Sequence, residues 1–142
     1  MSYAELHCLS NYSFLRGASH PSELVEQAVH LGYSALAITD ECSLAGVVKA
    51  HVVAKELDFK LIIGSEFNVS EGLKLVAIAP SRAAYGELSN LISRSRRRSE
   101  KGQYLTHLRD IYFHLKRCLI IWLPTHIDRD KYHADVLSRR FA

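Results

Sequence analysis

Three side chains in the sequence, His7, Asp40 and Glu66, could together bind a divalent metal ion. Each stands in, or shortly after, a short apolar run of the kind that forms a buried strand. Imidazole and carboxylate ligands together favour zinc, manganese or iron. A metal held by them could activate water for phosphoester hydrolysis. A structural interpretation stands beside this one: a hydrogen-bonded core histidine, a helix-capping aspartate and a glutamate paired with a base. Residue spacing alone does not separate the two.

The elements that must position these side chains alternate between strands and helices. Apolar runs predict strands over residues 3–9, 35–39, 60–64, 73–79 and 118–123. Helical spacing of apolar residues predicts helices over residues 19–32, 44–51, 85–92, 105–115 and 130–141. Such alternation implies parallel strands with right-handed crossovers, hence an α/β fold with a mainly parallel sheet. Functional side chains gather at the carboxyl ends of such strands, so we expect His7, Asp40 and Glu66 to lie near one another.

Chain length bears on the kind of sheet. A closed eight-stranded α/β barrel needs about 250 residues, whereas this chain has 142. Five predicted strands fit either a small open α/β domain or part of a larger barrel. Because the last helical pattern stops without a capping signal, we expect part of a barrel, with residues 1–142 in a single domain.

Composition predicts a globular protein. The chain is 48% hydrophobic and 23% charged, enough apolar material for one packed domain. It lacks both a membrane-length apolar stretch and the pattern of a signal peptide, so we expect a cytoplasmic protein without a membrane partner. The odd number of cysteines, Cys8, Cys42 and Cys118, favours reduced thiols over disulfides.

Positive charge is concentrated in one run, although the formal net charge is only +3. The run contains Arg94, Arg96, Arg97, Arg98 and Lys101. A solvated helix end is the simpler interpretation, because no aromatic residue is interleaved for base stacking. Contact with nucleic acid or with a partner protein is the alternative.

Three segments resemble the motifs of a known family. Residues 6–13, Leu-His-Cys-Leu-Ser-Asn-Tyr-Ser, resemble the first motif of the polymerase and histidinol phosphatase (PHP) domain. Residues 37–41, Ala-Ile-Thr-Asp-Glu, resemble its second motif, and residues 64–66, Gly-Ser-Glu, its third. Residues 11–19, 39–46 and 75–91 look like the N-terminal region of bacterial DNA polymerase III alpha-type subunits. The forms of residues 6–10 and 39–46 resemble the error-prone branch of these C-family polymerases.

The resemblance implies a fold and a setting. The fold is a distorted (β/α) barrel of about seven strands with a site for up to three metals, which in some members performs phosphoesterase or 3′–5′ exonuclease chemistry. In the polymerases this domain opens a much longer chain, whose remaining PHP, palm and fingers regions lie outside residues 1–142. The parent protein would act in damage-induced mutagenesis and translesion synthesis. Its partners would be DNA, the other polymerase domains and mutagenesis accessory proteins.

The sequence departs from the family pattern at several ligand positions. Leu9 stands in place of a histidine, Arg16 in place of an aspartate and Lys74 in place of another histidine. Glu41 also replaces a histidine, although it could still ligate a metal. The residual ligand set would be His7, Asp40, Glu41 and Glu66, and His126 falls near a later ligand region. We expect no catalytic residue and no cofactor, or at most weakly bound zinc or manganese.

Three hypotheses follow. The first is a structural, non-catalytic portion of a PHP domain in which Arg16 and Lys74 neutralise the remaining carboxylates. The second is an active metal-dependent phosphoesterase or exonuclease using the residual ligands. The third is a freestanding α/β binding module. If the chain is half of a barrel, its exposed strand edge and apolar faces should make it self-associate or leave it only marginally stable.

Overall fold

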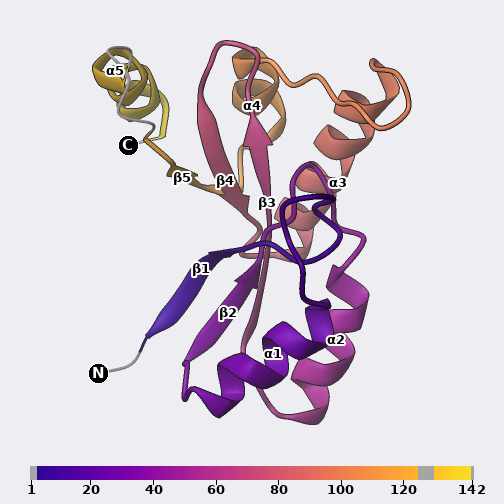
Figure 1. The fold of residues 1–142 in the computed structure, drawn as a ribbon. Helices are drawn as coiled ribbons and strands as arrows, with labels where there is room; N and C mark the ends of the chain where they lie inside the picture. The colour runs from indigo at the N-terminus through magenta and orange to yellow at the C-terminus, as the bar shows by residue number, and fades with distance from the viewer. Residues whose placement is uncertain (1–2, 125–129, 142) are drawn as a thin grey trace.

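The computed structural model describes residues 3–124 and 130–141. Its strands are β1 (Ala4–Cys8), β2 (Ala35–Ile38), β3 (Leu61–Asn68), β4 (Lys74–Ile78) and β5 (Leu119–Trp122). Its helices are α1 (Pro21–His30), α2 (Val47–Glu56), α3 (Arg82–Arg97), α4 (Leu108–His114) and α5 (Asp130–Phe141). Figure 1 shows α1 and α2 beside the parallel strands, and α3 and α4 beside the longer β3–β4 ribbon. No helix in the described part of the chain is long and apolar enough to cross a membrane.

The strands form one curled sheet in the order β1-β2-β3-β4-β5. The pairs β1–β2 and β2–β3 are parallel, whereas β3–β4 and β4–β5 are antiparallel. The predicted α/β class is therefore confirmed, but the sheet is mixed and not mainly parallel. The reason lies in residues 69–73, a connection too short for the crossover that a parallel pairing of β3 and β4 would need.

The two faces of the sheet differ because side chains alternate along a strand. The face toward the helices carries Leu36, Ile38, Phe67, Leu75 and Ala77, which pack in clusters with residues of α1 to α4. The opposite face carries Ala37, Val76 and Ile78 as a small apolar cluster of its own. Glu66 pairs with Val76 across β3 and β4, which places Glu66 on this second face. The sheet thus presents a buried carboxylate on the side away from the helices.

Local sequence explains how the first helices begin and end. Pro21 occupies the first turn of α1, where a missing N–H costs nothing. The backbone N–H of His20 donates to Glu23 at 2.7 Å, and Gly32 follows the helix at φ +70°. These signals determine where α1 begins and ends on the connection from β1 to β2.

Candidate functional site

Glu66 forms the centre of the site. Its side chain is completely buried. Three basic side chains surround the carboxylate: His7 Nε2 lies 2.6 Å from Oε2, Lys74 Nζ lies 3.3 Å from Oε2, and Arg16 contacts both oxygens. Burial alone would raise the pKa of Glu66. Hydrogen bonds from Arg16 and His7, with the charge of Lys74, outweigh burial and hold that pKa below its usual value. The carboxylate is therefore ionised and neutralised from within the chain.

Lys74 reaches Glu66 because of strand register. Lys74 pairs with Asn68 across the antiparallel β3–β4 ribbon, and Glu66 lies two residues from Asn68 on the same strand. Residues two apart share a face, so Lys74 and Glu66 are diagonal neighbours on the face away from the helices. The contact is built into the sheet and needs no loop to position it.

Arg16 reaches the site from a tight loop. Its guanidinium lies between two carboxylates, donating to Glu41 Oε2 at 2.6 Å and to Glu66. The loop closes because the backbone N–H groups of Arg16 and Gly17 both donate to the Ser13 carbonyl at 2.9 Å. A Cβ at Gly17 would come within 2.0 Å of the Ser10 carbonyl oxygen. Only glycine permits this approach, so Gly17 indirectly positions Arg16. The hydrogen bond to Glu66 raises the pKa of the Arg16 guanidinium.

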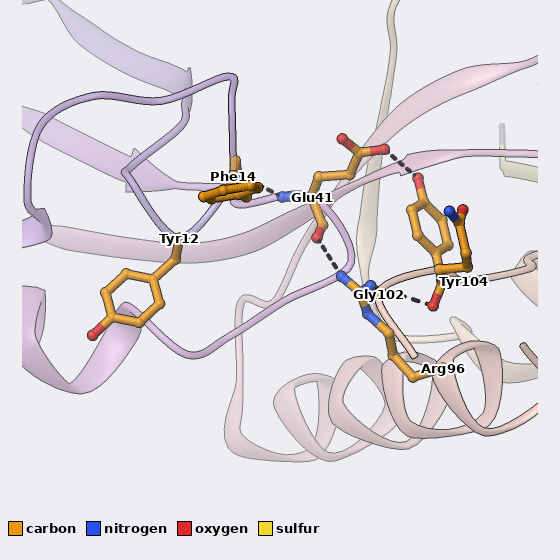
Figure 2. Close-up of a pocket in the computed structure, with 8 residues that line it drawn as sticks. Tyr12, Phe14, Glu41, Arg96, Gly102 and Tyr104 are labelled. Carbon is orange, nitrogen blue, oxygen red and sulfur yellow. Dashed lines mark hydrogen bonds between the residues drawn. The ribbon is translucent and has the colours of Figure 1, made fainter. Parts of the chain in front are cut away.

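Glu41 joins three segments of the chain. Its Oε1 accepts hydrogen bonds from Asn68 Nδ2 at 2.6 Å and from the Tyr104 hydroxyl at 2.7 Å, while Oε2 accepts from Arg16. Burial raises the pKa of Glu41, but the bonds from Tyr104, Arg16 and Asn68 outweigh it and lower the pKa overall. Figure 2 shows the Tyr104 hydroxyl pointing at the Glu41 carboxylate. Both oxygens of Glu41 therefore have partners within the protein.

Arg96 secures the backbone next to Glu41. Its guanidinium donates to the carbonyls of Glu41 and Cys42, both at 3.2 Å, and lies 5.2 Å from the centre of the Tyr104 ring. Cys42 has a φ of +45°, a conformation that costs energy in a residue with a side chain. The bonds from Arg96, visible in part in Figure 2, stabilise this turn. This arginine of the basic run is thus a structural residue.

Asp40 does not join the carboxylates at the site. Its Oδ1 accepts hydrogen bonds from Ser10 N at 2.8 Å and Ser13 Oγ at 2.7 Å, and its Oδ2 accepts from Ser10 Oγ at 2.7 Å. Asp40 lies near Glu66, as predicted, because the Asp40 carbonyl accepts from Glu66 N at 3.2 Å, but its side chain bonds to serines and not to the Glu66 site. Alternation explains this difference. Position 40 follows Leu36 and Ile38 on the face toward the helices, whereas position 41 falls on the face of Glu66.

Two residues of the site, Asn68 and Tyr104, were not predicted from the sequence. Asn68 could have been found, because it follows Glu66 by two residues on one strand. Tyr104 could not, since it arrives on a long connection whose path no local pattern predicts. Leu9 is half-buried and offers no ligand atom. His126 lies outside the described residues.

The donor set does not fit a metal ion. Within residues 3–124 and 130–141, no three histidine, cysteine, aspartate or glutamate side chains are grouped as ligands around one point. The carboxylates of Asp40, Glu41 and Glu66 already accept hydrogen bonds from serines, an asparagine, a tyrosine or basic groups. Arg16 and Lys74 also bring positive charge to Glu66, and like charge opposes a bound cation.

A hollow of about 410 Å³ adjoins Glu41. It is lined by Tyr12, Ser13, Phe14, Glu41, Arg96, Gly102, Gln103 and Tyr104. Figure 2 shows Phe14 on the loop across from Tyr104, and 85% of the Phe14 residue is exposed. The hollow is therefore open and partly aromatic, and it shares Glu41 with the ion-pair site.

The predicted basic run divides in the structure. Arg96 faces inward, and Arg98 forms a bidentate pair with Asp110, with N–O distances of 2.6 and 3.4 Å. Arg94 and Arg97 are exposed on the last turn of α3. The four arginines predicted as one patch thus have at least two different roles.

Comparison with known proteins adds two findings. Residues 5–135 match the PHP domain family. Among curated relatives, an error-prone DNA polymerase of Saccharophagus degradans is 64% identical over 124 residues, which cover 87% of this chain and 12% of that protein. Another error-prone DNA polymerase, of Teredinibacter turnerae, is 56% identical over 141 residues, covering 99% of this chain and 14% of the relative. The chain therefore spans only about an eighth of the length of these relatives.

Solved structures resemble the fold. A candidate metal-dependent phosphoesterase from Bifidobacterium adolescentis has a TM-score of 0.55 and 29% identity, covering 68% of this chain and 34% of that one. An amidohydrolase from Chromobacterium violaceum, solved with sulfate and without metal, has a TM-score of 0.57 and 25% identity over the same shares. These two proteins therefore share the fold of about two thirds of this chain.

Proposed function

Because the chain belongs to the PHP domain family, we propose that it is the N-terminal portion of the PHP domain of an error-prone DNA polymerase, with a structural role. The relatives that match it almost end to end are named as such polymerases. They are also several times longer, so the remaining PHP, palm and fingers regions would lie outside these 142 residues. In this proposal the chain supports the polymerase and performs no chemistry of its own.

One observation carries the structural role: Arg16 and Lys74 contact Glu66, a buried carboxylate at the family's ligand position. A fully buried carboxylate needs a compensating positive charge, and in a metal centre the ion supplies it. Here two side chains of the protein supply it. Arg16 also donates hydrogen bonds to both oxygens of Glu66 in bidentate geometry, whereas Lys74 contributes its charge. These cations support a site that is stable without an ion, and among the described residues the carboxylates of Asp40, Glu41 and Glu66 already have partners within the protein.

A second candidate is a metal-dependent phosphoesterase or 3′–5′ exonuclease. The observation in its favour is the fold shared with the Bifidobacterium adolescentis protein, together with His7 placed beside Glu66. For this activity, zinc or manganese would have to displace Arg16 and Lys74 from the carboxylate. That displacement costs the hydrogen bonds described above and leaves two cations next to the metal.

The wider setting belongs to the same proposal. The parent protein would synthesise DNA past lesions during damage-induced mutagenesis, with the other polymerase domains and mutagenesis accessory proteins as partners. Its place would be the cytoplasm, where bacterial DNA is copied. The names of the relatives support a DNA polymerase as the parent protein, and their lengths support the presence of further domains.

A nuclease assay tests the proposal. The 142-residue chain would be incubated with end-labelled single-stranded DNA in manganese or zinc, beside a Glu66→Gln variant. We expect no hydrolysis above the background of the variant. Metal-dependent hydrolysis by the wild type that disappears in Glu66→Gln would overturn the structural role and support the second candidate. A preparation whose activity persists in Glu66→Gln contains a contaminating nuclease and must be purified further before the comparison is made.

A further inference from the structure

The basic run at the end of α3 contains both structural and uncommitted arginines. Arg96 is held by backbone carbonyls and by the Tyr104 ring, and Arg98 is held by Asp110. Arg94 and Arg97 are different. In the described parts of the chain, the side chain of neither has a hydrogen bond or a carboxylate partner. Both are exposed to solvent. The protein fold therefore accounts for half of the arginines in the run.

Arg94 and Arg97 lie three residues apart on one helix, so their side chains project from the same face. With Arg98 they line a shallow hollow of about 280 Å³, and no other residue in the described part of the chain lines it. Like charges at this spacing repel each other by a few tenths of a kcal/mol. The negative end of the α3 dipole offsets part of that repulsion. Even so, two guanidinium groups without a described carboxylate partner, beside an Arg98 that is paired with Asp110, form a surface that favours an anion.

We propose that Arg94 and Arg97 contact the phosphate backbone of duplex DNA. Guanidinium groups bind phosphate oxygens in bidentate geometry, and Arg94 and Arg97 are free to do so because only Arg98 beside them is paired with a carboxylate in the described structure. Among the described residues no aromatic side chain lines the hollow, so the hollow offers unpaired bases no surface for stacking. The contact is therefore with the backbone and independent of base sequence. The choice of DNA as the polyanion rests on the proposed function, whereas the anion-binding surface does not.

A purely structural role for Arg94 and Arg97 makes a different prediction. Arginines in the last turn of a helix stabilise its carbonyl end by about 0.3–1 kcal/mol. If that were their only role, replacing them would lower the melting temperature and leave any DNA binding unchanged. Glutamine preserves most of the helix propensity of arginine, so Arg94→Gln with Arg97→Gln removes charge with little effect on the helix itself.

The matched control is Lys55→Gln with Lys60→Gln. It removes the same charge from exposed positions at and after the end of α2, on the far side of the fold from the end of α3 (Figure 1). Any loss of binding that depends only on net charge would be equal in the two double variants. A loss that depends on the arginine surface would be confined to the first.

The experiment is a fluorescence anisotropy titration of a short labelled duplex with the 142-residue chain at several salt concentrations. We expect Arg94→Gln/Arg97→Gln to bind roughly tenfold more weakly at about 0.05 M salt, with a salt slope shallower by about 1 to 2. The control should bind nearly as the wild type does. Three results would overturn the inference: no binding by the wild type, equal losses in both variants, or tighter binding to single strands than to duplex.

Failure of this inference can be told apart from failure of the proposed function. The nuclease assay does not involve Arg94 or Arg97, and the anisotropy titration does not involve Glu66. A chain that binds no duplex and hydrolyses no DNA would retain the proposed structural role. A chain that hydrolyses DNA through Glu66 and also binds duplex through α3 would retain only the arginine surface.

Discussion

Replacing Arg16 should destabilise the protein in a pH-dependent way. In Arg16→Met the buried Glu66 carboxylate loses its bidentate partner and Glu41 loses one donor. Breaking a buried ion pair by removing one partner costs about 3–5 kcal/mol. Arg16 retains 33% exposure, and His7 and Lys74 remain beside Glu66, so the cost is reduced. We expect a loss of about 2–3 kcal/mol in the free energy of unfolding at neutral pH.

The pH dependence has a definite sign. In the wild type the folded-state pKa of Glu66 lies below its ordinary value of 4.5, so the ion pairs stabilise the protein above that pH. That stability is lost as the pH falls through the folded-state pKa. In Arg16→Met burial is less opposed, so the folded-state pKa of Glu66 rises relative to the wild type. The stability difference between the two proteins should therefore be small near pH 4, grow as the pH rises, and become constant near neutrality.

Urea denaturation followed by circular dichroism measures this difference between pH 4 and 7. The control is Arg117→Met, which makes the same arginine-to-methionine change in the ion pair of Arg117 with Glu87. In that pair the Arg117 side chain is 64% exposed. Exposed pairs contribute at most about 1 kcal/mol, so this variant should cost less than that. Adding Glu66→Gln to Arg16→Met should recover part of the loss, because the double variant no longer buries an underpaired charge. Equal costs for the two arginine variants, or a cost of Arg16→Met that does not change with pH, would refute the reasoning.

Three further outcomes are expected. Tyr104→Phe, which removes two hydrogen bonds of the hydroxyl, should lower the free energy of unfolding by about 1–2 kcal/mol, whereas Tyr85→Phe should change it by less than about 0.5 kcal/mol, both measured by urea denaturation. Gly17→Ala should lower the free energy of unfolding by more than about 3 kcal/mol, because its Cβ would overlap the Ser10 carbonyl. Gly86→Ala on α3 has open space around its Cβ and should raise the free energy of unfolding by about 0.5–1 kcal/mol. A similar effect of both variants would contradict the loop geometry. Sedimentation velocity should show self-association, since β1 and β5 each have a single neighbour in the described sheet; a monomer at all concentrations would argue for a self-sufficient domain.

Sequence reasoning located the site through strand periodicity and motif resemblance. The pattern predicts His7 and Lys74 within strands and Glu66 just after one. In the structure Glu66 lies within β3, and the three side chains come together. The contact of Arg16 with Glu66 is also present, whereas the role of Arg16 and Lys74 as replacements for a metal stays a prediction. The strand-end rule gives the edge of the sheet and not the face on which a side chain lies, so it predicts the position of Asp40 but not the bonds of its side chain to two serines.

Long-range contacts set the limit of what the sequence could predict. The network through Tyr104 and Arg96 depends on how the connection between α3 and α4 returns to the sheet, and no local spacing encodes that path. The mixed character of the sheet could be inferred from the sequence more easily. Residues 69–73 are too few to hold a crossover helix, so the antiparallel β3–β4 pairing could have been inferred from the chain length between the two strands.

The central claim is that cations of the protein occupy the place of a metal beside Glu66. The most direct test is titration of the purified wild-type chain with zinc and with manganese. Calorimetry measures binding, and the shift in melting temperature measures stabilisation. A Leu9→His/Lys74→His variant, which restores two lost ligands, is the comparison. If the cations replace the metal, the wild type should neither bind either metal stoichiometrically nor be stabilised by it. The double variant should show a rise in melting temperature with zinc. Stoichiometric, tight binding by the wild type with Lys74 in place, abolished by Glu66→Gln, would contradict it.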